Sequence, residues 1–285
     1  MLTILVTGGA SGIGLATVNG LLKGKHSVIL VDQYNPDHQP VLEDLFRRYP
    51  GQVSHYTCDL QKQASVAELI DHLRMNFTCL DVLINNAGRF PKAEAEFCDD
   101  VETTFAVNVM APYLLSVGLM TLLSKTGRGR IINVSSIGER YARSDWSDIQ
   151  SVKMPWNANR VYNNSKFYLT LLTYALAERF KGRKITVNCL HPGPTATNLV
   201  QSTGGLSWPM RILFGLVKPF RQTPEHAART SLFLATDPSV DGLTGCYFSK
   251  CHRENSSVPS QDPVAQQRIL AYCELLRTKS SQRLP

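Results

Sequence analysis

Short runs of apolar and β-branched residues alternate with longer segments of helical periodicity along the chain. This alternation predicts parallel strands joined by helices. Several of the runs are apolar almost throughout, which is typical of strands covered on both faces. The predicted strands cover residues 2–6, 27–31, 53–57, 82–84, 130–134, 185–190 and 245–248. The predicted helices cover residues 13–24, 62–76, 99–123, 158–180, 224–236 and 262–277. We therefore predict an α/β protein with a single doubly wound parallel sheet flanked by helices, in one domain over residues 1–285.

Two segments interrupt this pattern. Residues 138–159 form a polar, Trp-containing insertion between a predicted strand and a predicted helix. Residues 199–222 are rich in large apolar side chains and predict a lid. Both segments follow strand ends at the carboxyl edge of the sheet, where open parallel sheets bind their ligands.

Composition and charge narrow the class of protein. With 285 residues, of which 43% are hydrophobic, the chain can bury a large core, and wholesale disorder is excluded. The formal charge of +7 allows anionic partners. However, the basic residues are scattered and form no long stripe, so we expect no nucleic-acid partner.

Cysteine usage and the start of the chain suggest a location. Seven cysteines, odd in number and widely spaced, are typical of reduced thiols inside a cell. The nearest pair, Cys246 and Cys251, has only His252 beside it, so we expect no metal site. The first strand begins next to Met1, which leaves no room for a signal peptide, and no apolar stretch approaches the length of a bilayer span. We expect a soluble, cytoplasmic protein.

A glycine-rich loop follows the first predicted strand and opens the first helix, with the sequence Thr7-Gly8-Gly9-Ala10-Ser11-Gly12-Ile13-Gly14. Gly8 lets the chain leave the strand without a Cβ clash, Gly12 lets the backbone approach a pyrophosphate, and Gly14 lets the helix pack on the sheet. The helix N-terminus attracts the phosphate charge. An ordinary glycine turn is the alternative. The order strand, loop, helix and second strand favours a dinucleotide-binding Rossmann fold.

The second predicted strand ends at Asp32, 18 residues after Gly14. A carboxylate at this place accepts hydrogen bonds from both ribose hydroxyls of NAD and repels the 2′-phosphate of NADP. Neither Ser11 nor Gln33 and Tyr34 supplies a compensating cation. We predict NAD as the cofactor, with NADP less favoured; an acid that caps the next turn is the alternative.

Three further motifs complete a known pattern: Asn85-Asn86-Ala87-Gly88, Asn133-Val134-Ser135-Ser136 and Tyr162-Asn163-Asn164-Ser165-Lys166. Together with the TGxxxGxG loop they occur in the order found in the short-chain dehydrogenase/reductase family. The chain resembles this family from about Thr3 to Phe248, and the glycine spacing resembles that of its single-domain branch. The resemblance implies a nicotinamide-dependent oxidoreductase.

The chemistry of the third motif agrees with this resemblance. Tyr162 and Lys166 are four residues apart and share one helix face. Lowering the pKa of a tyrosine from 10 to about 7 requires roughly 4 kcal/mol of stabilisation of the phenolate. A neighbouring ammonium supplies part of that stabilisation. Tyr162 then exchanges a proton with an alcohol or carbonyl. A packed Tyr and a solvated Lys would be the structural alternative.

The resemblance also implies roles for other residues. Ser136 would bind the reacting oxygen, with Ser135 as the alternative, and Asn108 would take the family's fourth catalytic position, where a helix distortion holds a relay water. Lys166 would also hold the nicotinamide ribose. His191 fits a structural role at a strand end better than acid–base chemistry. The remaining predicted cofactor contacts are Asp59 and Leu60 at the adenine, Asn85, Ala87 and Gly88 at the adenosine, and Pro192, Gly193, Thr195 and Thr197 near the nicotinamide.

A weaker resemblance concerns the substrate. The 26-residue spacing from Ser136 to Tyr162 and the C-terminal third resemble the retinol-dehydrogenase-like group, although Asp32 departs from the NADP preference of many of its members. The apolar lid favours a lipophilic alcohol, aldehyde or ketone. Its basic residues Arg211, Lys218 and Arg221 would allow peripheral membrane contact. A homo-oligomer is plausible for the family. A nucleotide-binding regulatory protein without turnover is the alternative function.

Overall fold

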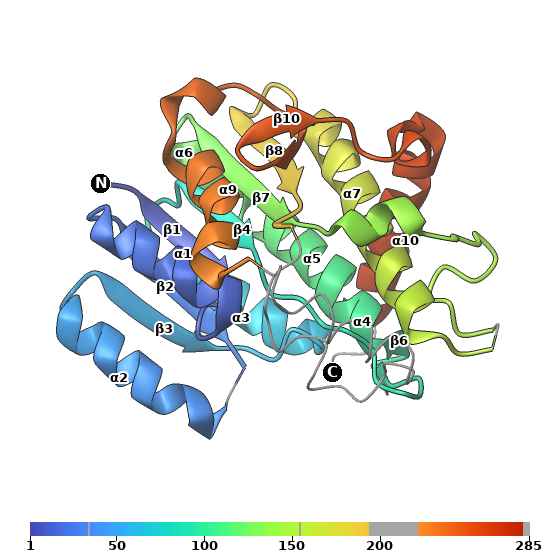
Figure 1. The fold of residues 1–285 in the computed structure, drawn as a ribbon, viewed down its shortest axis with the longest axis horizontal. Helices are drawn as coiled ribbons and strands as arrows, with labels where there is room; N and C mark the ends of the chain where they lie inside the picture. The colour runs from blue at the N-terminus through green and yellow to red at the C-terminus, as the bar shows by residue number, and fades with distance from the viewer. Residues whose placement is uncertain (34, 154, 194–221, 282–285) are drawn as a thin grey trace.

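One twisted sheet crosses the middle of the molecule (Figure 1). The computed structural model describes residues 1–33, 35–153, 155–193 and 222–281. Among these residues, eight strands form the sheet in the order β10-β9-β8-β7-β4-β1-β2-β3, and a two-stranded sheet pairs β5 with β6. The strands of the large sheet are β1 Thr3–Thr7, β2 Ser27–Asp32, β3 Val53–Thr57, β4 Val82–Asn85, β7 Gly129–Val134, β8 Ile185–Leu190, β9 Tyr247–Ser249 and β10 His252–Glu254.

The predicted doubly wound sheet is confirmed. The chain winds outward from β1 to β2 and β3, then returns to β4 on the other side of β1 and continues to β7, β8 and β9. These neighbours pair in parallel, and only β10 adds an antiparallel edge to β9. The reversal of direction beside β1 places a crevice at the carboxyl ends of β1 and β4, which is where such sheets bind ligands.

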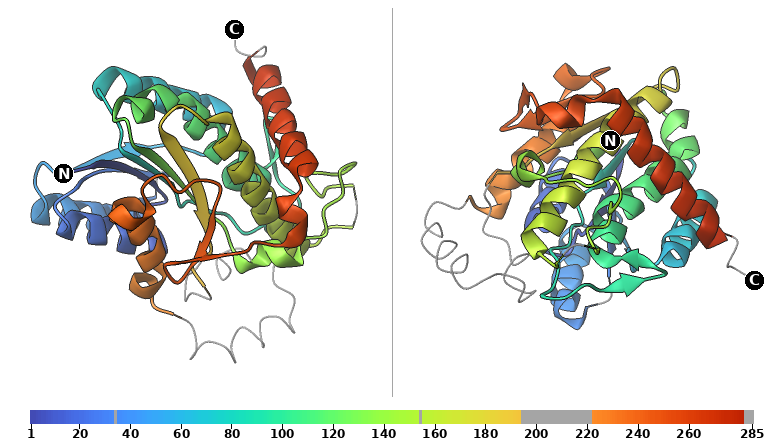
Figure 2. Two further views of the ribbon diagram at one scale, coloured as in Figure 1. Left: turned by 90° about the horizontal axis from the view of Figure 1, so that it is seen from above. Right: turned by 90° about the vertical axis from the view of Figure 1, so that its right-hand side faces the viewer.

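Helices cover both faces of the sheet (Figure 2). Successive residues of β1 point to opposite faces: Ile4 and Val6 join one apolar cluster, and Leu5 joins the other. On the first face lie α1 Gly12–Lys23, α2 Gln39–Arg48 and α9 Pro224–Thr236. On the second face lie α3 Gln63–Asn76, α5 Ala111–Gly118, α6 Met120–Lys125 and α7 Ala158–Arg179, and α10 Pro263–Ser281 packs on α7.

The single helix predicted over residues 99–123 is wrong. The segment begins with the hairpin β5 Phe97–Cys98 and β6 Val101–Glu102, because Asp99 and Asp100 both take positive φ angles. The helical part then divides into α4 Thr103–Phe105, the π-helix η2 Ala106–Met110, α5 and α6. The Glu102 carboxylate caps this helical run by accepting hydrogen bonds from the backbone N–H groups of Thr104 and Phe105.

Two other regions differ from prediction. Helix α2 and the 3₁₀ turn η1 Pro36–His38 before it were not predicted; within α2 only Leu42 and Leu45 are buried, so its apolar stripe is short. The strand predicted at 245–248 begins later, at Tyr247, because Gly245 adopts a positive φ of 64° in a turn. Short 3₁₀ turns also occur at η3 Ile137–Tyr141, η5 Pro238–Val240 and η6 Val258–Gln261.

The predicted insertion packs against α7. Asn164 on α7 accepts a hydrogen bond from the Arg143 N–H (2.8 Å) and donates to the Arg143 carbonyl (3.1 Å) and to Ser151 Oγ (2.9 Å). Because these bonds connect the insertion to the helix that carries Tyr162 and Lys166, the insertion supports one wall of the site. The predicted lid, apart from Gln222, lies outside the described residues, as do Thr195 and Thr197.

Candidate active site

A cavity of about 980 Å³ opens at the carboxyl ends of the central strands. It runs from the glycine-rich loop after β1, past the ends of β2 and β3, to α7. Most of the predicted site residues line it: Gly8, Ser11, Gly12, Ile13, Gly14, Asp32, Asp59, Leu60, Ala87, Gly88, Tyr162, Lys166 and Pro192. The topology thus brings residues from distant parts of the sequence together in one cleft.

The glycine-rich loop has the form that a pyrophosphate requires. Gly8 and Gly12 take positive φ angles of 67° and 53°. A Cβ on Gly14 would lie 1.9 Å from the Gly8 carbonyl oxygen and 2.5 Å from Asn86 Nδ2, so only glycine fits there. The Ser11 side chain does not cap α1, and no acidic residue stands in the first turn of the helix. The first backbone N–H groups of α1 are therefore available to an anion, and these residues fit a dinucleotide.

Asp32 lies at the end of β2, at the outer part of the cavity. Its side chain is only 10% exposed. Oδ2 accepts a hydrogen bond from the Ala10 N–H (2.8 Å), and Oδ1 accepts one from the Gln33 N–H (2.8 Å). These bonds hold the carboxylate toward the glycine-rich loop, where the ribose of a nucleotide on that loop would lie.

Tyr162 and Lys166 face the inner end of the cavity from α7. Lys166 Nζ lies 5.9 Å from the centre of the Tyr162 ring, and Phe90 packs on the same ring with ring centres 5.1 Å apart. Burial raises the pKa of Tyr162, and a hydrogen bond with Ser136 opposes that rise. The phenol is therefore neutral at physiological pH and able to donate a proton.

Lys166 is nearly inaccessible, with 3% of its surface exposed. Its ammonium donates a hydrogen bond to the Val134 carbonyl oxygen at the end of β7 (2.9 Å). Burial lowers the pKa of Lys166 to about 8. The ammonium also lies close to Gly88, because a Cβ at Gly88 would be 3.4 Å from Nζ.

The two adjacent serines at the end of β7 have different surroundings. Ser135 Oγ donates to the Lys166 carbonyl oxygen (3.0 Å) and shares a hydrogen bond with Thr170 Oγ1 (3.0 Å) inside the core. Ser136 Oγ accepts from the Gly138 N–H (3.1 Å) and is hydrogen-bonded to the Tyr162 hydroxyl. Although Ser135 lines the cavity and Ser136 does not, Ser136 is the one joined to the phenol.

Asn108 lies in the π-helix η2, fully buried behind the cavity. Oδ1 accepts from the Arg89 N–H (2.8 Å), and Nδ2 donates to the Arg89 carbonyl oxygen (2.9 Å) and to Ser165 Oγ (2.9 Å). The helix distortion expected here is present. Hydrogen bonds of Asn108 and Lys166 therefore bring four elements together: η2, the loop after β4, α7 and the end of β7.

Two of the predicted contacts do not line the cavity. Asn85 is buried in the sheet, where Nδ2 donates to Asn133 Oδ1 (2.8 Å). Its neighbour Asn86 lines the cavity instead and ties the loop down through hydrogen bonds to the carbonyl oxygens of Thr7 (2.9 Å) and Gly8 (3.2 Å). Gly193 also lies away from the lining, with its N–H donating to His191 Nδ1 (3.2 Å).

Several lining residues were missed in the sequence. The Asn85-Asn86 pair could have indicated Asn86 as a lining residue. Nothing in the local sequence pattern indicated His38, which lies in η1. The cavity lining also includes Ala10, Leu15, Gln33, Asn35, Asp37, Val41, Cys58, Gln61, Arg89, Phe90, Val107, Val134 and Pro224.

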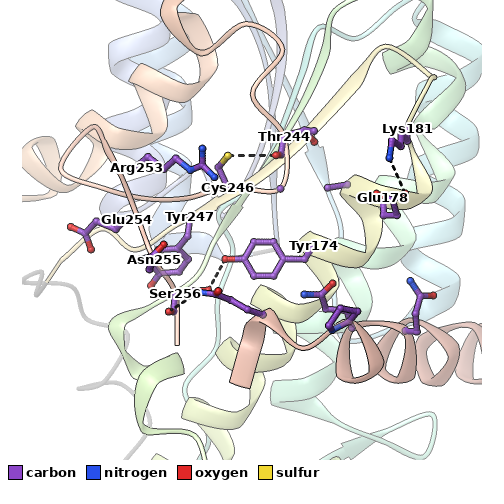
Figure 3. A pocket seen from close by; sticks show the side chains of 16 residues that line it. Tyr174, Glu178, Lys181, Thr244, Cys246, Tyr247, Arg253, Glu254, Asn255 and Ser256 are labelled. Atoms are coloured by element: carbon purple, nitrogen blue, oxygen red, sulfur yellow. Dashed lines mark hydrogen bonds and ion pairs between the residues drawn. The ribbon is translucent and has the colours of Figure 1, made fainter. Parts of the chain in front are cut away.

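A second cavity, of about 640 Å³, lies between the later turns of α7, the β9–β10 hairpin and the start of α10 (Figure 3). Two of its lining residues bond each other, with the hydroxyls of Tyr174 and Ser256 2.6 Å apart, and the neighbouring Ser260 Oγ donates to Ser256 Oγ (2.7 Å). These bonds fasten the hairpin to α7, and none of the predicted site residues lies there.

The described residues contain no group of three His, Cys, Asp or Glu side chains placed to bind a metal ion. They also contain no helix with the length and apolar character needed to cross a membrane.

Comparison with known proteins gives consistent similarities. A family model described as short chain dehydrogenase matches residues 2–205. Retinol dehydrogenase 14 of Mus musculus is 32% identical, over 96% of this chain and 85% of that protein. The WW domain-containing oxidoreductase of Drosophila melanogaster is 31% identical, over 96% of this chain and 68% of that protein. The solved structure of an uncharacterized protein from Mycobacterium paratuberculosis shares the fold, with a TM-score of 0.76, 23% identity, and coverage of 97% of this chain and 93% of that one.

Proposed function

The chain belongs to the short chain dehydrogenase family and is an NAD(P)-dependent oxidoreductase of CH–OH groups, and on that premise we propose that it prefers NAD and acts on a lipophilic alcohol, aldehyde or ketone. One observation carries the proposal. The same cavity holds a ribose-side carboxylate, Asp32, at one end and the pair Tyr162 and Lys166 at the other. A dinucleotide lying between them would place its reactive ring beside the phenol.

The residues at the inner end support proton exchange coupled to hydride transfer. When bound, a nicotinamide cofactor supplies or accepts the hydride. The Tyr162 hydroxyl donates a proton to a carbonyl in reduction, and the Tyr162 phenolate accepts one from an alcohol in oxidation. The Lys166 ammonium, 5.9 Å from the centre of the Tyr162 ring, would stabilise a phenolate by its charge, and the hydrogen bond with Ser136 lowers the pKa of Tyr162 against the effect of burial.

Asp32 supports the preference for NAD. Its two existing hydrogen bonds leave lone pairs on both carboxylate oxygens for ribose hydroxyls. A 2′-phosphate at the same place would meet a largely buried negative charge, which electrostatic repulsion disfavours.

The apolar residues near Tyr162 support a lipophilic substrate. Phe90 packs on the Tyr162 ring, and Val107 and Pro192 also line the cavity. Such a surface gains free energy by covering apolar atoms and excludes water from the reacting carbon. The names of the relatives point the same way, because retinol is a lipophilic alcohol.

Direct binding and turnover measurements test this proposal. NADH and NADPH would be titrated by the change in nucleotide fluorescence, and lipophilic alcohols and carbonyls would be screened with both cofactors by absorbance of the reduced nicotinamide. We expect tighter NADH binding and turnover of at least one lipophilic substrate. Tighter NADPH binding would overturn the cofactor assignment. Binding without any turnover would favour a nucleotide-binding regulatory protein, although Asn108, Ser136, Tyr162 and Lys166 are all present.

A further inference from the structure

His38 stands next to Asp32 at the outer end of the cavity. Its Nδ1 lies 3.9 Å from Asp32 Oδ1, and the side chains are only 16% and 10% exposed. Nδ1 has no hydrogen-bond partner among the described residues, whereas Nε2 lies 3.4 Å from Asn35 Nδ2. Although His38 immediately precedes α2, its side chain does not cap that helix. The imidazole is therefore held beside the carboxylate, and its Nδ1 is not committed to another hydrogen bond.

We propose that His38 sets how strongly this site discriminates between NAD and NADP, because a proton on its imidazole offsets the Asp32 charge that repels a 2′-phosphate. Imidazoles gain this proton between about pH 8 and pH 5. The imidazole lies 3.9 Å from a largely buried carboxylate, where solvent screens charges poorly. A positive charge gained by His38 therefore attracts an anion bound nearby. NADP binding should consequently improve, relative to NAD, as the pH falls. This inference rests on the proposed NAD preference and refines it.

The other charged groups around His38 do not supply this switch. His55 on β3 faces the same carboxylate; burial lowers its pKa, Asp32 opposes that shift and His38 adds to it, so His55 is neutral at pH 7. On α2, Asp44 pairs with Arg47 (2.7 Å) and Arg48 (2.6 Å). Glu43 on α2 accepts a hydrogen bond from Gln39, Asp59 after β3 pairs with Lys62, and Asp37 lies beside His38 in η1. Carboxyl groups ordinarily ionise below pH 5 and imidazoles between about pH 5 and pH 8, so the comparison that matters is between His38 and His55.

The test is the ratio of the dissociation constants of NADPH and NADH, measured by nucleotide fluorescence at pH 8.0 and pH 5.5. The 2′-phosphate itself gains a proton near pH 6, so native protein must be compared with variants. In His38→Gln the imidazole is replaced by a neutral side chain, and His55→Gln is the matched control. Between the two pH values, we expect the ratio to fall about tenfold further in native protein and in His55→Gln than in His38→Gln.

An equal fall of the NADPH-to-NADH ratio in His38→Gln and in native protein would overturn the proposal. If the additional fall of the ratio is lost only in His55→Gln, the pH dependence belongs to His55 instead. If His38→Gln does not fold, His38→Asn gives a second neutral replacement, and the additional fall in the ratio should be lost in that variant as well. Tighter binding of NADPH than of NADH to native protein at pH 8.0 would refute the NAD preference, and the native-to-variant difference would still report on His38.

Discussion

The Lys166 ammonium is fixed to the end of β7 by its 2.9 Å hydrogen bond to the Val134 carbonyl oxygen. This bond places a positive charge 5.9 Å from the centre of the Tyr162 ring, in a position with almost no solvent. Such a charge is costly to bury, and the cost appears as a pKa lowered to about 8. The free protein therefore keeps a buried ammonium beside Tyr162 at the expense of its own stability.

Replacing Lys166 by Met should abolish turnover and stabilise the free protein. The ordinary lysine pKa of 10.5 is lowered to about 8, and each unit corresponds to about 1.4 kcal/mol of unfolding free energy. Losing the bond to Val134 costs about 1 kcal/mol. We therefore expect Lys166→Met to raise the free energy of unfolding at pH 7 by about 2 kcal/mol, measured by urea denaturation.

The stability difference between Lys166→Met and native protein should depend on pH. Between pH 8 and pH 10.5 the unfolded chain holds the Lys166 proton and the folded protein does not, so native stability should rise through this range. The advantage of Lys166→Met should shrink accordingly. Lys181→Met, at a side chain 77% exposed, is the control and should change stability little at either pH. A destabilised Lys166→Met protein at pH 7 would contradict this reading.

Tyr162→Phe should remove the proton donor and leave the nucleotide site intact. Loss of a positioned acid–base group lowers turnover by roughly 10² to 10⁴-fold. NADH binding should stay within about twofold of native, because affinity comes chiefly from the glycine-rich loop and Asp32. Steady-state kinetics and fluorescence titration separate the two effects. Tyr49→Phe, at the end of α2, provides the control. An unchanged turnover rate in Tyr162→Phe would refute the assigned role.

Asn108→Ala should destabilise the region where η2, the loop after β4 and α7 meet. The substitution removes the three hydrogen bonds of a fully buried side chain and leaves the backbone N–H and carbonyl groups of Arg89 without a partner in Asn108. Unsatisfied buried polar groups cost about 1–3 kcal/mol each, and relaxation recovers part of this, so we expect a total loss of about 2–4 kcal/mol. Urea unfolding measures the loss. Asn76→Ala is the control, since its exposed amide bonds only the His72 carbonyl of its own helix; equal stabilities of the two variants would contradict the prediction.

The parts of the site that sequence predicted are those in which chemistry and chain order coincide. The glycine-rich loop, Asp32 and the Tyr162–Lys166 pair each depend on a spacing within one strand–loop–helix unit or one helix turn. Their convergence then follows from the sheet topology, because the carboxyl ends of neighbouring parallel strands meet at one edge.

What sequence missed depends on contacts between distant residues. Local pattern does not show which of two adjacent asparagines turns toward the cavity: Asn85 pairs with Asn133 from the next strand, and Asn86 ties down the glycine-rich loop. The helix expected from residue 99 was cut short by two positive φ angles and by a cap from Glu102. His38 reaches Asp32 only because η1 folds back over the end of β2.

Gly14→Ala should abolish nucleotide binding and weaken the fold. The new Cβ would lie 1.9 Å from the Gly8 carbonyl oxygen, and because that neighbour is backbone, the loop itself must move. Overpacking of this kind costs typically about 1–3 kcal/mol, and a displaced loop no longer presents its N–H groups to a pyrophosphate. Gly51→Ala is the control for backbone strain without a clash. Its φ of 74° strains an alanine by about 1 kcal/mol, but no atom lies within 4 Å of the new Cβ. Gly51→Ala should bind NADH as the native protein does. If Gly14→Ala retains native NADH affinity, then the close packing of α1 against the end of β1 is not what shapes the phosphate site.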